Sequence, residues 1–183
     1  HEKERFVRAF AYIDEEAARL AADDSTERYR AGRAFGPLDG CPFGIKDTIE
    51  TKDMPMQQNA PLFKGWSGGR DAACVWALRQ GGGVTLGKTQ VPKYAMGKSP
   101  PTRNPFDTSR TAGGSSSGSA AAVGDNMVPL AFGTQTAGSV IRPASFCGTA
   151  AYKCTLGQFG LAGVKMVAQS LDSLGVFARS VAD

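Results

Sequence analysis

The feature that most constrains this chain is a pair of serine-bearing turns separated by a short apolar stretch. The first is a run of small residues, Gly113-Gly114-Ser115-Ser116-Ser117-Gly118-Ser119, which continues through alanines to Val123. The second spans residues 134–143 and carries Ser139. Each turn leads into a stretch that favours a helix, where free backbone N–H groups can stabilise a developing negative charge. Together with Lys46 upstream, the two turns can form a catalytic site that needs no histidine.

Composition nearly excludes histidine chemistry. The only histidine among the 183 residues is His1, at a terminus where side chains are rarely held in place. Triads that use a histidine base and metal sites built on imidazole therefore have no good candidate. We expect no metal and no cofactor.

Charge and hydropathy exclude two classes of partner. Apolar residues make up 42% and charged residues 21% of the chain, as in ordinary soluble domains with a core. The net charge of +4 is scattered along the sequence, whereas nucleic-acid binders gather basic residues on one face. No apolar stretch approaches the ~20 residues that span a bilayer. We therefore expect neither a nucleic-acid nor a membrane partner.

The four cysteines form no C-x-x-C pair and have apolar or glycine-rich neighbours. This pattern predicts buried free thiols in a reducing compartment rather than a disulfide framework. We accordingly predict a cytoplasmic protein.

Helix-like and strand-like stretches alternate along the chain, which predicts an α/β fold with a mixed β-sheet flanked by helices. Apolar spacing predicts a helix over 3–22, and Lys46 is expected on or just beyond a strand within 42–49. Asp71 is expected to cap the next helix. The remaining expected elements are a loop over 50–70, a strand over 84–86, a long loop over 92–114, a helix over 119–123, a strand over 128–132 and a helix from Ser139. We divide the chain into an N-terminal helical segment, 1–35, and a core, 36–183.

Two common motifs match formally but in the wrong context. Residues 82–89 fit the phosphate-binding pattern G-x-x-x-x-G-K-[ST], yet a strand-like stretch occupies the middle and Pro92 follows closely. We interpret them as a strand end with a solvated Lys88. Residues 114–118 fit the G-x-S-x-G nucleophile elbow, but that machinery requires a histidine later in the chain, and none follows.

A third interpretation rests on a longer match. Residues 113–123 and 133–148 resemble the signature segment of the amidase signature family. Gly44-Ile45-Lys46-Asp47, Leu86-Gly87-Lys88-Thr89, Pro101-Thr102-Arg103-Asn104-Pro105 and Ser170-Leu171-Asp172-Ser173-Leu174-Gly175 are similar to that family in the same order. The resemblance runs from about Gly36 to the C-terminus, and it implies the amidase signature fold. Family members are much longer than this chain, so we expect the core to be truncated at its C-terminal side, with exposed faces that favour association.

The resemblance implies a Ser-cisSer-Lys triad. Matching motif to motif places the base on Lys46, the bridging serine, preceded by a cis peptide bond, on Ser115 and the nucleophile on Ser139. A lysine serves as base only if its environment lowers its pKa enough to leave it neutral. Cleavage then proceeds through an acyl-serine intermediate that water hydrolyses.

The same resemblance implies an oxyanion hole made by the backbone N–H groups of Thr136, Ala137, Gly138 and Ser139. Ala137 stands where the family usually has glycine, so a positive φ there would strain the turn by about 1 to 2 kcal/mol. Further departures are Ala112, Ala151 and Cys154. Arg142 follows the nucleophile by one helical turn and can either bind a substrate carboxylate bidentately or form a structural ion pair.

These observations predict a hydrolase: an amidase that cleaves the C–N bond of a small-molecule amide. Two alternatives stay open, namely an amidotransferase subunit of the A type that releases ammonia from glutamine for a partner enzyme, and a catalytically impaired binding or structural domain. A homodimer is a further possible assembly.

Overall fold

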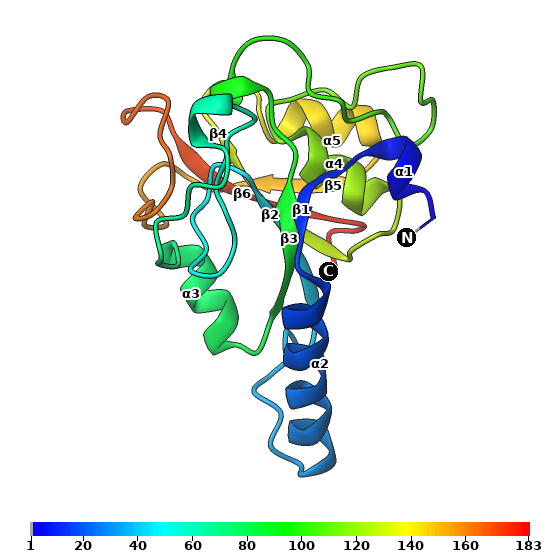
Figure 1. Cartoon of the computed structure of the whole chain (residues 1–183), viewed down its shortest axis with the longest axis vertical. Coiled ribbons are helices and arrows are strands. Elements are labelled where there is room, and N and C mark those ends of the chain that lie inside the picture. The colour runs from blue at the N-terminus through cyan, green and yellow to red at the C-terminus, as the bar shows by residue number, and fades with distance from the viewer. Residues whose placement is uncertain (1) are drawn as a thin grey trace.

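The computed structural model describes residues 2–183, which form one six-stranded mixed sheet with helices on both faces (Figure 1). The spatial order of the strands is β1-β3-β2-β4-β6-β5. The three central strands, β3, β2 and β4, run parallel to one another, and the outer strands are antiparallel to their neighbours. The strand bounds are β1 Phe10–Ile13, β2 Pro42–Lys46, β3 Val84–Thr89, β4 Leu130–Gln135, β5 Ala150–Lys153 and β6 Ser173–Ala178. The predicted α/β fold with a mixed sheet is confirmed.

The helices link the parallel strands in the βαβ manner. Helix α3 connects β2 to β3 on one face, while α4 and α5 cover the other face (Figure 1). The long helix α2 projects beyond the end of the sheet. The helix bounds are α1 Glu4–Val7, α2 Glu15–Arg30, α3 Ala73–Gln80, α4 Ser117–Gly124 and α5 Ile141–Cys147, with 3₁₀ turns at η1 Pro61–Phe63 and η2 Lys93–Ala95. No helix within residues 2–183 combines the length and apolarity that crossing a bilayer requires.

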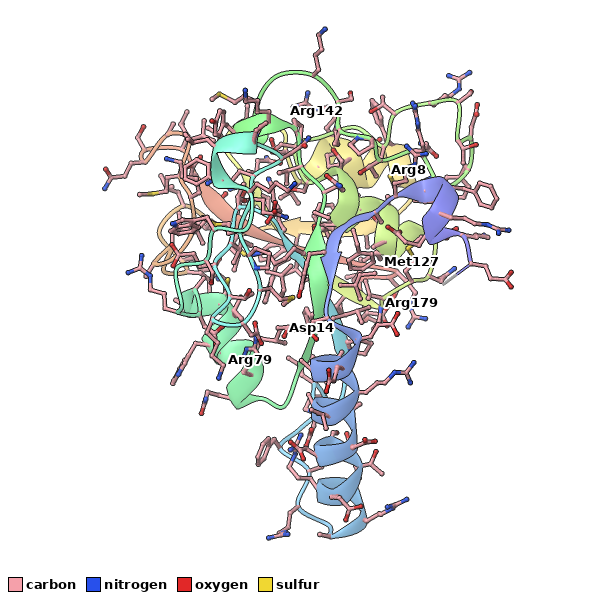
Figure 2. All side chains as sticks on the ribbon, in the orientation of Figure 1. Arg8, Asp14, Arg79, Met127, Arg142 and Arg179 are labelled. Carbon is pink, nitrogen blue, oxygen red and sulfur yellow. The ribbon has the colours of Figure 1, made fainter. Side chains whose placement is uncertain are left out.

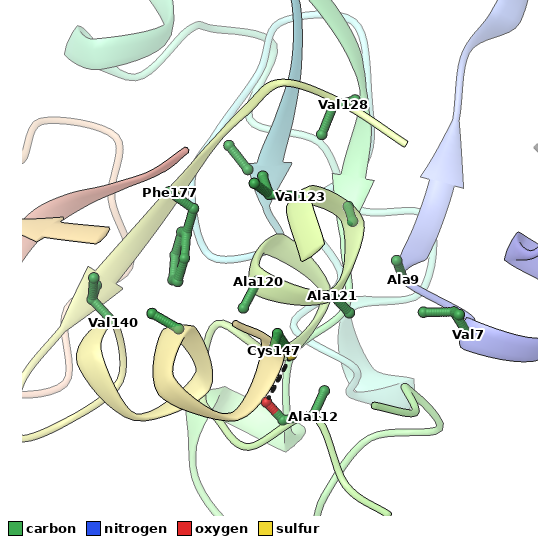
Figure 3. Packing of buried hydrophobic residues seen from close by; sticks show 13 residues of the cluster. Val7, Ala9, Ala112, Ala120, Ala121, Val123, Val128, Val140, Cys147 and Phe177 are labelled. Atoms are coloured by element: carbon green, nitrogen blue, oxygen red, sulfur yellow. Dashed lines mark hydrogen bonds between the residues drawn. The ribbon is translucent and has the colours of Figure 1, made fainter. Parts of the chain in front are cut away.

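Small side chains let α4 lie unusually close to the sheet. Every residue of α4 from Ser117 to Val123 is buried, and its alanines pack against Ala9, Val128 and Phe177 (Figure 3). A Cβ on Gly118 would lie 2.1 Å from the carbonyl oxygen of Ala9 and 2.3 Å from the backbone nitrogen of Gln90. The glycine-serine-alanine run therefore has a packing reason, because larger residues would push the helix off the strands.

The prediction of one helix over 3–22 is wrong, because a turn and a strand interrupt it between residues 8 and 14. The chain ends α1 at Val7, turns through Arg8 in the left-handed region, and forms strand β1 before α2 begins at Glu15. The Glu4 carboxylate accepts the backbone N–H groups of Ala9 and Phe10, which stabilises the turn. The free edge of β3 then supplies backbone partners for β1, and these outweigh the local helical preference.

Several other expected elements shift or change. Asp71 does not cap α3, since the N-cap residue is Ala72 and the Asp71 carboxylate instead accepts the Lys52 N–H and pairs with Arg79. The strand expected over 84–86 extends to Thr89. The strand expected over 128–132 is β4, which begins at Leu130, and the helix expected from Ser139 is α5, which begins at Ile141. The sequence analysis did not predict strands β5 and β6. All four cysteines are free, with Cys147 and Cys154 buried and Cys41 and Cys74 partly so.

Lys88 is buried rather than solvated, which corrects its interpretation as a surface group. The side chain is 0% exposed and donates to the backbone oxygen of Ile49. Burial lowers the pKa of Lys88 to about 8, while the charge of Asp47 opposes that shift. The phosphate-loop pattern around it lies largely within strand β3 and opens no helix, so it has no loop with which to cradle a phosphate.

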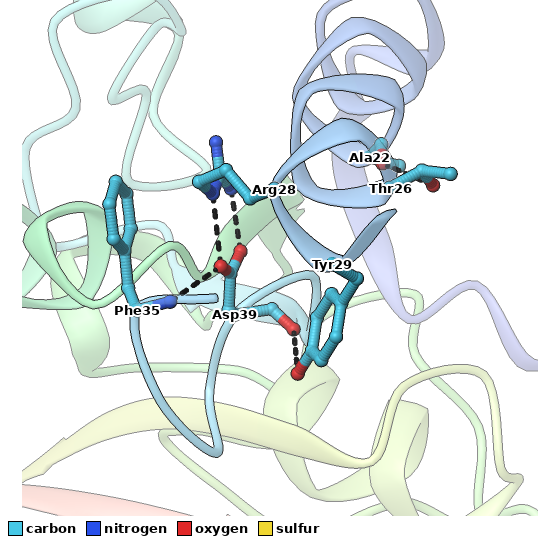
Figure 4. Close-up of polar contacts among 6 residues, drawn as sticks. All are labelled: Ala22, Thr26, Arg28, Tyr29, Phe35 and Asp39. Atoms are coloured by element: carbon cyan, nitrogen blue, oxygen red, sulfur yellow. Dashed lines mark hydrogen bonds and ion pairs between the residues drawn. The ribbon is translucent and has the colours of Figure 1, made fainter. Parts of the chain in front are cut away.

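One buried carboxylate ties the end of α2 to the following loop (Figure 4). Asp39 accepts two hydrogen bonds from the Arg28 guanidinium, at 2.9 and 2.6 Å, and one from the Phe35 N–H. The guanidinium holds the pKa of the Asp39 carboxyl well below its usual range. Tyr29 adds a hydrogen bond to the Asp39 backbone oxygen. These contacts hold the C-terminal end of α2 to the loop that leads back to β2.

The close approach of α4 to the sheet generates a stability prediction. Gly118→Ala places a methyl group against backbone atoms of Ala9, Thr89 and Gln90, where β1 begins and β3 ends. This backbone cannot easily move aside, so we expect a loss of about 3 kcal/mol in unfolding free energy. Gly160→Ala is the matched control, because its Cβ would meet nothing within 4 Å and its change should stay within about 1 kcal/mol. Urea unfolding followed by circular dichroism measures both, and equal stabilities would contradict the packing argument.

Candidate active site

The carboxyl ends of the parallel strands β2 and β4 bring the candidate residues together. Lys46 is the last residue of β2, and Ser139 lies in the turn between β4 and α5. Ser115 lies just before α4, which packs over both strands. Adjacent parallel strands end at the same edge of a sheet, and this is where open α/β folds bind ligands. The structure therefore brings Lys46, Ser115 and Ser139, which are far apart in the sequence, to the same edge of the sheet.

The Lys46 amine is buried and fully surrounded by acceptors. The side chain is 0% exposed, and Nζ lies 2.8 Å from Ser115 Oγ, 2.8 Å from Thr134 Oγ1 and 3.1 Å from the Thr134 carbonyl oxygen. Burial lowers the pKa of Lys46 to about 7, and the negative charge of Asp172 opposes part of that shift. At a pH near this pKa about half of the amine is neutral and available as a base.

Ser115 and Ser139 lie on neighbouring turns. The peptide bond between Gly114 and Ser115 is cis, and the side chain of Ser115 is 5% exposed. The next residue, Ser116, donates its backbone N–H to the Ser139 carbonyl oxygen at 3.2 Å. Both Ser115 and Ser139 line a cavity of about 230 Å³ and a second one of about 410 Å³.

The turn over residues 136–139 presents a run of unpaired backbone donors. Within residues 2–183, the N–H groups of Thr136, Ala137, Gly138 and Ser139 donate to no protein acceptor. The turn leads directly into α5, so the helix dipole adds to the field that these donors create. Ala137 has no positive φ, so the alanine is accommodated without backbone strain.

Arg142 lies beside the same turn, at the upper end of the molecule in the view of Figure 2. Its side chain is exposed and lines the 410 Å³ cavity together with Ser115 and Ser139. The guanidinium lies over Gly138, and Arg142 forms no ion pair with any residue in the described range 2–183. A structural ion pair is therefore not what holds this side chain in the structure.

Besides Thr134, which holds the Lys46 amine, two further residues that the sequence analysis did not assign contact the site. Gln135 Oε1 accepts the N–H groups of Val140 and Ile141, at 2.7 and 3.0 Å, and so fixes the start of α5 behind Ser139. Asp172 is 5% exposed, lines the smaller cavity and accepts the Thr136 hydroxyl. Gln135 follows the end of the apolar stretch and Asp172 lies in a matched motif, but no local pattern in the sequence indicates what either side chain contacts.

The described residues offer no metal centre. No group of three or more histidine, cysteine or acidic side chains within 2–183 is arranged to hold an ion. The groups near Ser139 are an amine, hydroxyls and backbone amides, which fit nucleophilic attack by an activated serine.

Comparisons with known proteins point to one family. The amidase family model matches residues 2–183. The A subunit of glutamyl-tRNA(Gln) amidotransferase from Acidothermus cellulolyticus is 43% identical over 183 residues, which cover 97% of this chain and 36% of that protein. The chain thus spans a little over a third of the length of such curated relatives.

Solved structures agree in fold. The peptide amidase from Stenotrophomonas maltophilia superposes with a TM-score of 0.92 at 33% identity, covering 99% of this chain and 40% of that one. The A subunit of glutamyl-tRNA(Gln) amidotransferase from Thermotoga maritima superposes with a TM-score of 0.82 at 33% identity, covering 97% and 38%. The sequence and the fold both identify this chain as a member of the amidase family.

Proposed function

We propose that the protein hydrolyses the C–N bond of a small amide through an acyl intermediate on Ser139. One observation carries the proposal: the buried Lys46 amine lies 2.8 Å from Ser115 Oγ, beside a turn of unpaired amides that ends at Ser139. An unassisted serine hydroxyl is a poor nucleophile, and this arrangement supplies both a proton acceptor and donors for the oxyanion.

In the proposed reaction, Ser139 Oγ attacks the amide carbonyl carbon and its proton passes to Ser115, whose own hydroxyl proton passes to neutral Lys46. The amides of the 136–139 turn hold the negative oxygen of the tetrahedral intermediate. Collapse breaks the C–N bond as the proton returns from Lys46 through Ser115 to the leaving nitrogen. Water then attacks the acyl ester by the same relay in reverse, which regenerates Ser139. The two serine hydroxyls must approach within about 3 Å, and catalytic hydrogen bonds often tighten only when substrate binds.

The contacts of Lys46 support its proposed role. In the protonated state, its three N–H groups match the three acceptors around Nζ. In the neutral state, one lone pair is free to accept the Ser115 proton. A proton can therefore pass along the Ser115–Lys46 hydrogen bond in either direction, toward the amine during attack and back from it during collapse.

Arg142 supports a substrate that carries a carboxylate. Its guanidinium lines the cavity that contains Ser115 and Ser139 and forms no ion pair with an acidic residue among residues 2–183. A planar guanidinium binds a carboxylate through two parallel hydrogen bonds. We therefore propose an amide with a carboxylate one short spacer away from the scissile bond.

A second candidate is the ammonia-releasing subunit of a glutamine amidotransferase. It is favoured by the 43% identity to the A subunit of glutamyl-tRNA(Gln) amidotransferase, and glutamine is itself a small amide that carries a carboxylate. We further propose a cytoplasmic location, because four free thiols suit a reducing compartment, and a homodimer as the assembly of the single-component enzyme.

The nucleophile is tested by covalent labelling. A fluorophosphonate probe should form one adduct on Ser139, located by mass spectrometry of the digested protein. Ser139→Ala should abolish the adduct, whereas Ser145→Ala, which removes an exposed serine on the following helix α5, should keep it. An unlabelled folded protein would favour the impaired binding domain over the enzyme.

The role of Lys46 predicts a pH profile. A base must be neutral to act, so kcat/KM should fall about tenfold per pH unit below a pKa of about 7 and level off above it. Lys46→Ala should lower kcat by about 10²- to 10⁴-fold while leaving the circular dichroism spectrum unchanged. Lys98→Ala, in an exposed loop, serves as the control, and a rate that is flat from pH 5 to 9 would remove Lys46 from the reaction.

Arg142 predicts a selective loss of binding. Arg142→Gln should raise KM by about 10- to 100-fold for an amide with a free carboxylate, because a charge-assisted hydrogen-bond pair is lost. KM for the matched methyl ester of the same amide should barely change. Equal effects on both substrates would show that Arg142 supports the turn rather than the ligand.

The two candidate functions separate in a partner assay. As an amidase, the purified protein alone should release ammonia from simple amides. As an amidotransferase subunit, it should release ammonia from glutamine at a rate that rises when the partner subunits are added. Ammonia release measured with both substrates, with and without partners, decides between them.

A further inference from the structure

Asp172 connects two segments that border the proposed active site. It precedes strand β6, is 5% exposed and lines the 230 Å³ cavity with Ser115 and Ser139. Its two oxygens have different partners: Oδ1 accepts the Thr136 hydroxyl, and Oδ2 accepts the backbone N–H groups of Val167 and Ala168 at 2.6 and 3.0 Å. The carboxylate therefore bridges the 136–139 turn and the segment 161–168.

The 136–139 turn depends on such side-chain contacts because its own amides are unpaired within the described residues. At its far end, Gln135 Oε1 holds the N–H groups of Val140 and Ile141. At its near end, the polar contact of the Thr136 side chain is with Asp172. Donors that must converge on one oxygen need to be fixed before the reaction begins.

The segment 161–168 is in turn fixed to the residues that follow Lys46. Glu50 N–H donates to the Gly163 carbonyl oxygen at 2.9 Å, and Lys165 N–H donates to the Thr48 carbonyl oxygen at 2.8 Å. A chain of hydrogen bonds thus runs from the end of β2 through segment 161–168 and Asp172 to the turn after β4. It joins the side of the site that carries the amine to the side that carries the free amides.

We propose that Asp172 is a positioning residue that clamps the 136–139 turn through Thr136, so that the free amides stay aligned for the transition state. The proposal rests on the proposed hydrolytic function. The location of the carboxylate gives it a second influence, since its charge opposes the effect of burial on the Lys46 amine. Lys165 is the other charged side chain that lines this cavity within residues 2–183.

Thr136 offers the cleaner substitution, because valine keeps its shape and removes only the hydroxyl. Thr136→Val should lower kcat about tenfold with KM nearly unchanged, since donors that serve only the transition state are misaligned. Thr136→Ser should restore most of the rate. Thr102→Val is the matched control: it removes another largely buried hydroxyl, one that donates to the Arg8 carbonyl oxygen, and should leave kcat unchanged.

A second measurement does not depend on activity. Hydrogen exchange followed by mass spectrometry over residues 138–144 reports the N–H groups that Gln135 holds. Asp172→Ala and Thr136→Val should each speed that exchange by about fivefold or more, although neither residue touches those groups. Thr102→Val should leave it unchanged.

The outcomes divide cleanly. A raised KM with unchanged kcat in Thr136→Val, or unchanged exchange over 138–144 in both variants, overturns the clamp. If the unaltered protein hydrolyses no amide, the proposed function fails, and the exchange comparison still decides whether Asp172 holds the turn. If Thr136→Val does not fold, Asp172→Asn replaces it, because the amide keeps the shape of the carboxylate and removes its charge.

Discussion

The arrangement of the proposed active site depends on the burial of one amine. Removing the Lys46 side chain from water costs several kcal/mol if it stays charged, and the protein offsets that cost with Ser115 and both oxygens of Thr134. These acceptors come from the turn before α4 and from β4, so the amine can be satisfied only when α4, β2 and β4 are packed together. The same packing lowers the pKa of the amine to about 7, so a substantial fraction is uncharged near physiological pH and can accept a proton.

Close packing explains why the signature residues are small. Gly44 on β2 faces the Thr89 side chain, where a Cβ would lie 2.9 Å from Cγ2, and Gly118 on α4 faces the backbone where β1 begins and β3 ends. Without Gly118 the helix would sit farther from the sheet, and Ser115, just before that helix, would move away from Lys46. Two constraints therefore shape the motif: the proposed chemistry needs the serines, and close backbone contact needs glycine at position 118.

Local patterns predicted that the residues proposed to react lie at a strand end or before a helix, whereas their proposed roles came from the resemblance to the amidase signature family. Lys46 is the last residue of a largely buried strand, and Ser115 and Ser139 each precede a helix. The contacts of Asp172 were not predictable, since its partner Thr136 lies 36 positions away and an aspartate before a strand is common in any turn. Strand β1 was missed for a similar reason: its partner is the edge of β3, and the isolated segment has helical spacing.

By itself, the sequence determined the fold class, the family resemblance and the order of the candidate reactive groups along the chain, because periodicity and small-residue motifs are local properties. The tertiary structure decided which of these groups meet. It buried Lys46 against Ser115, buried Lys88 against the Ile49 carbonyl oxygen, and left the amides of residues 136–139 without acceptors within residues 2–183. Burial and the pairing of distant polar groups depend on how strands and helices are assembled in space, and no local pattern carries that information.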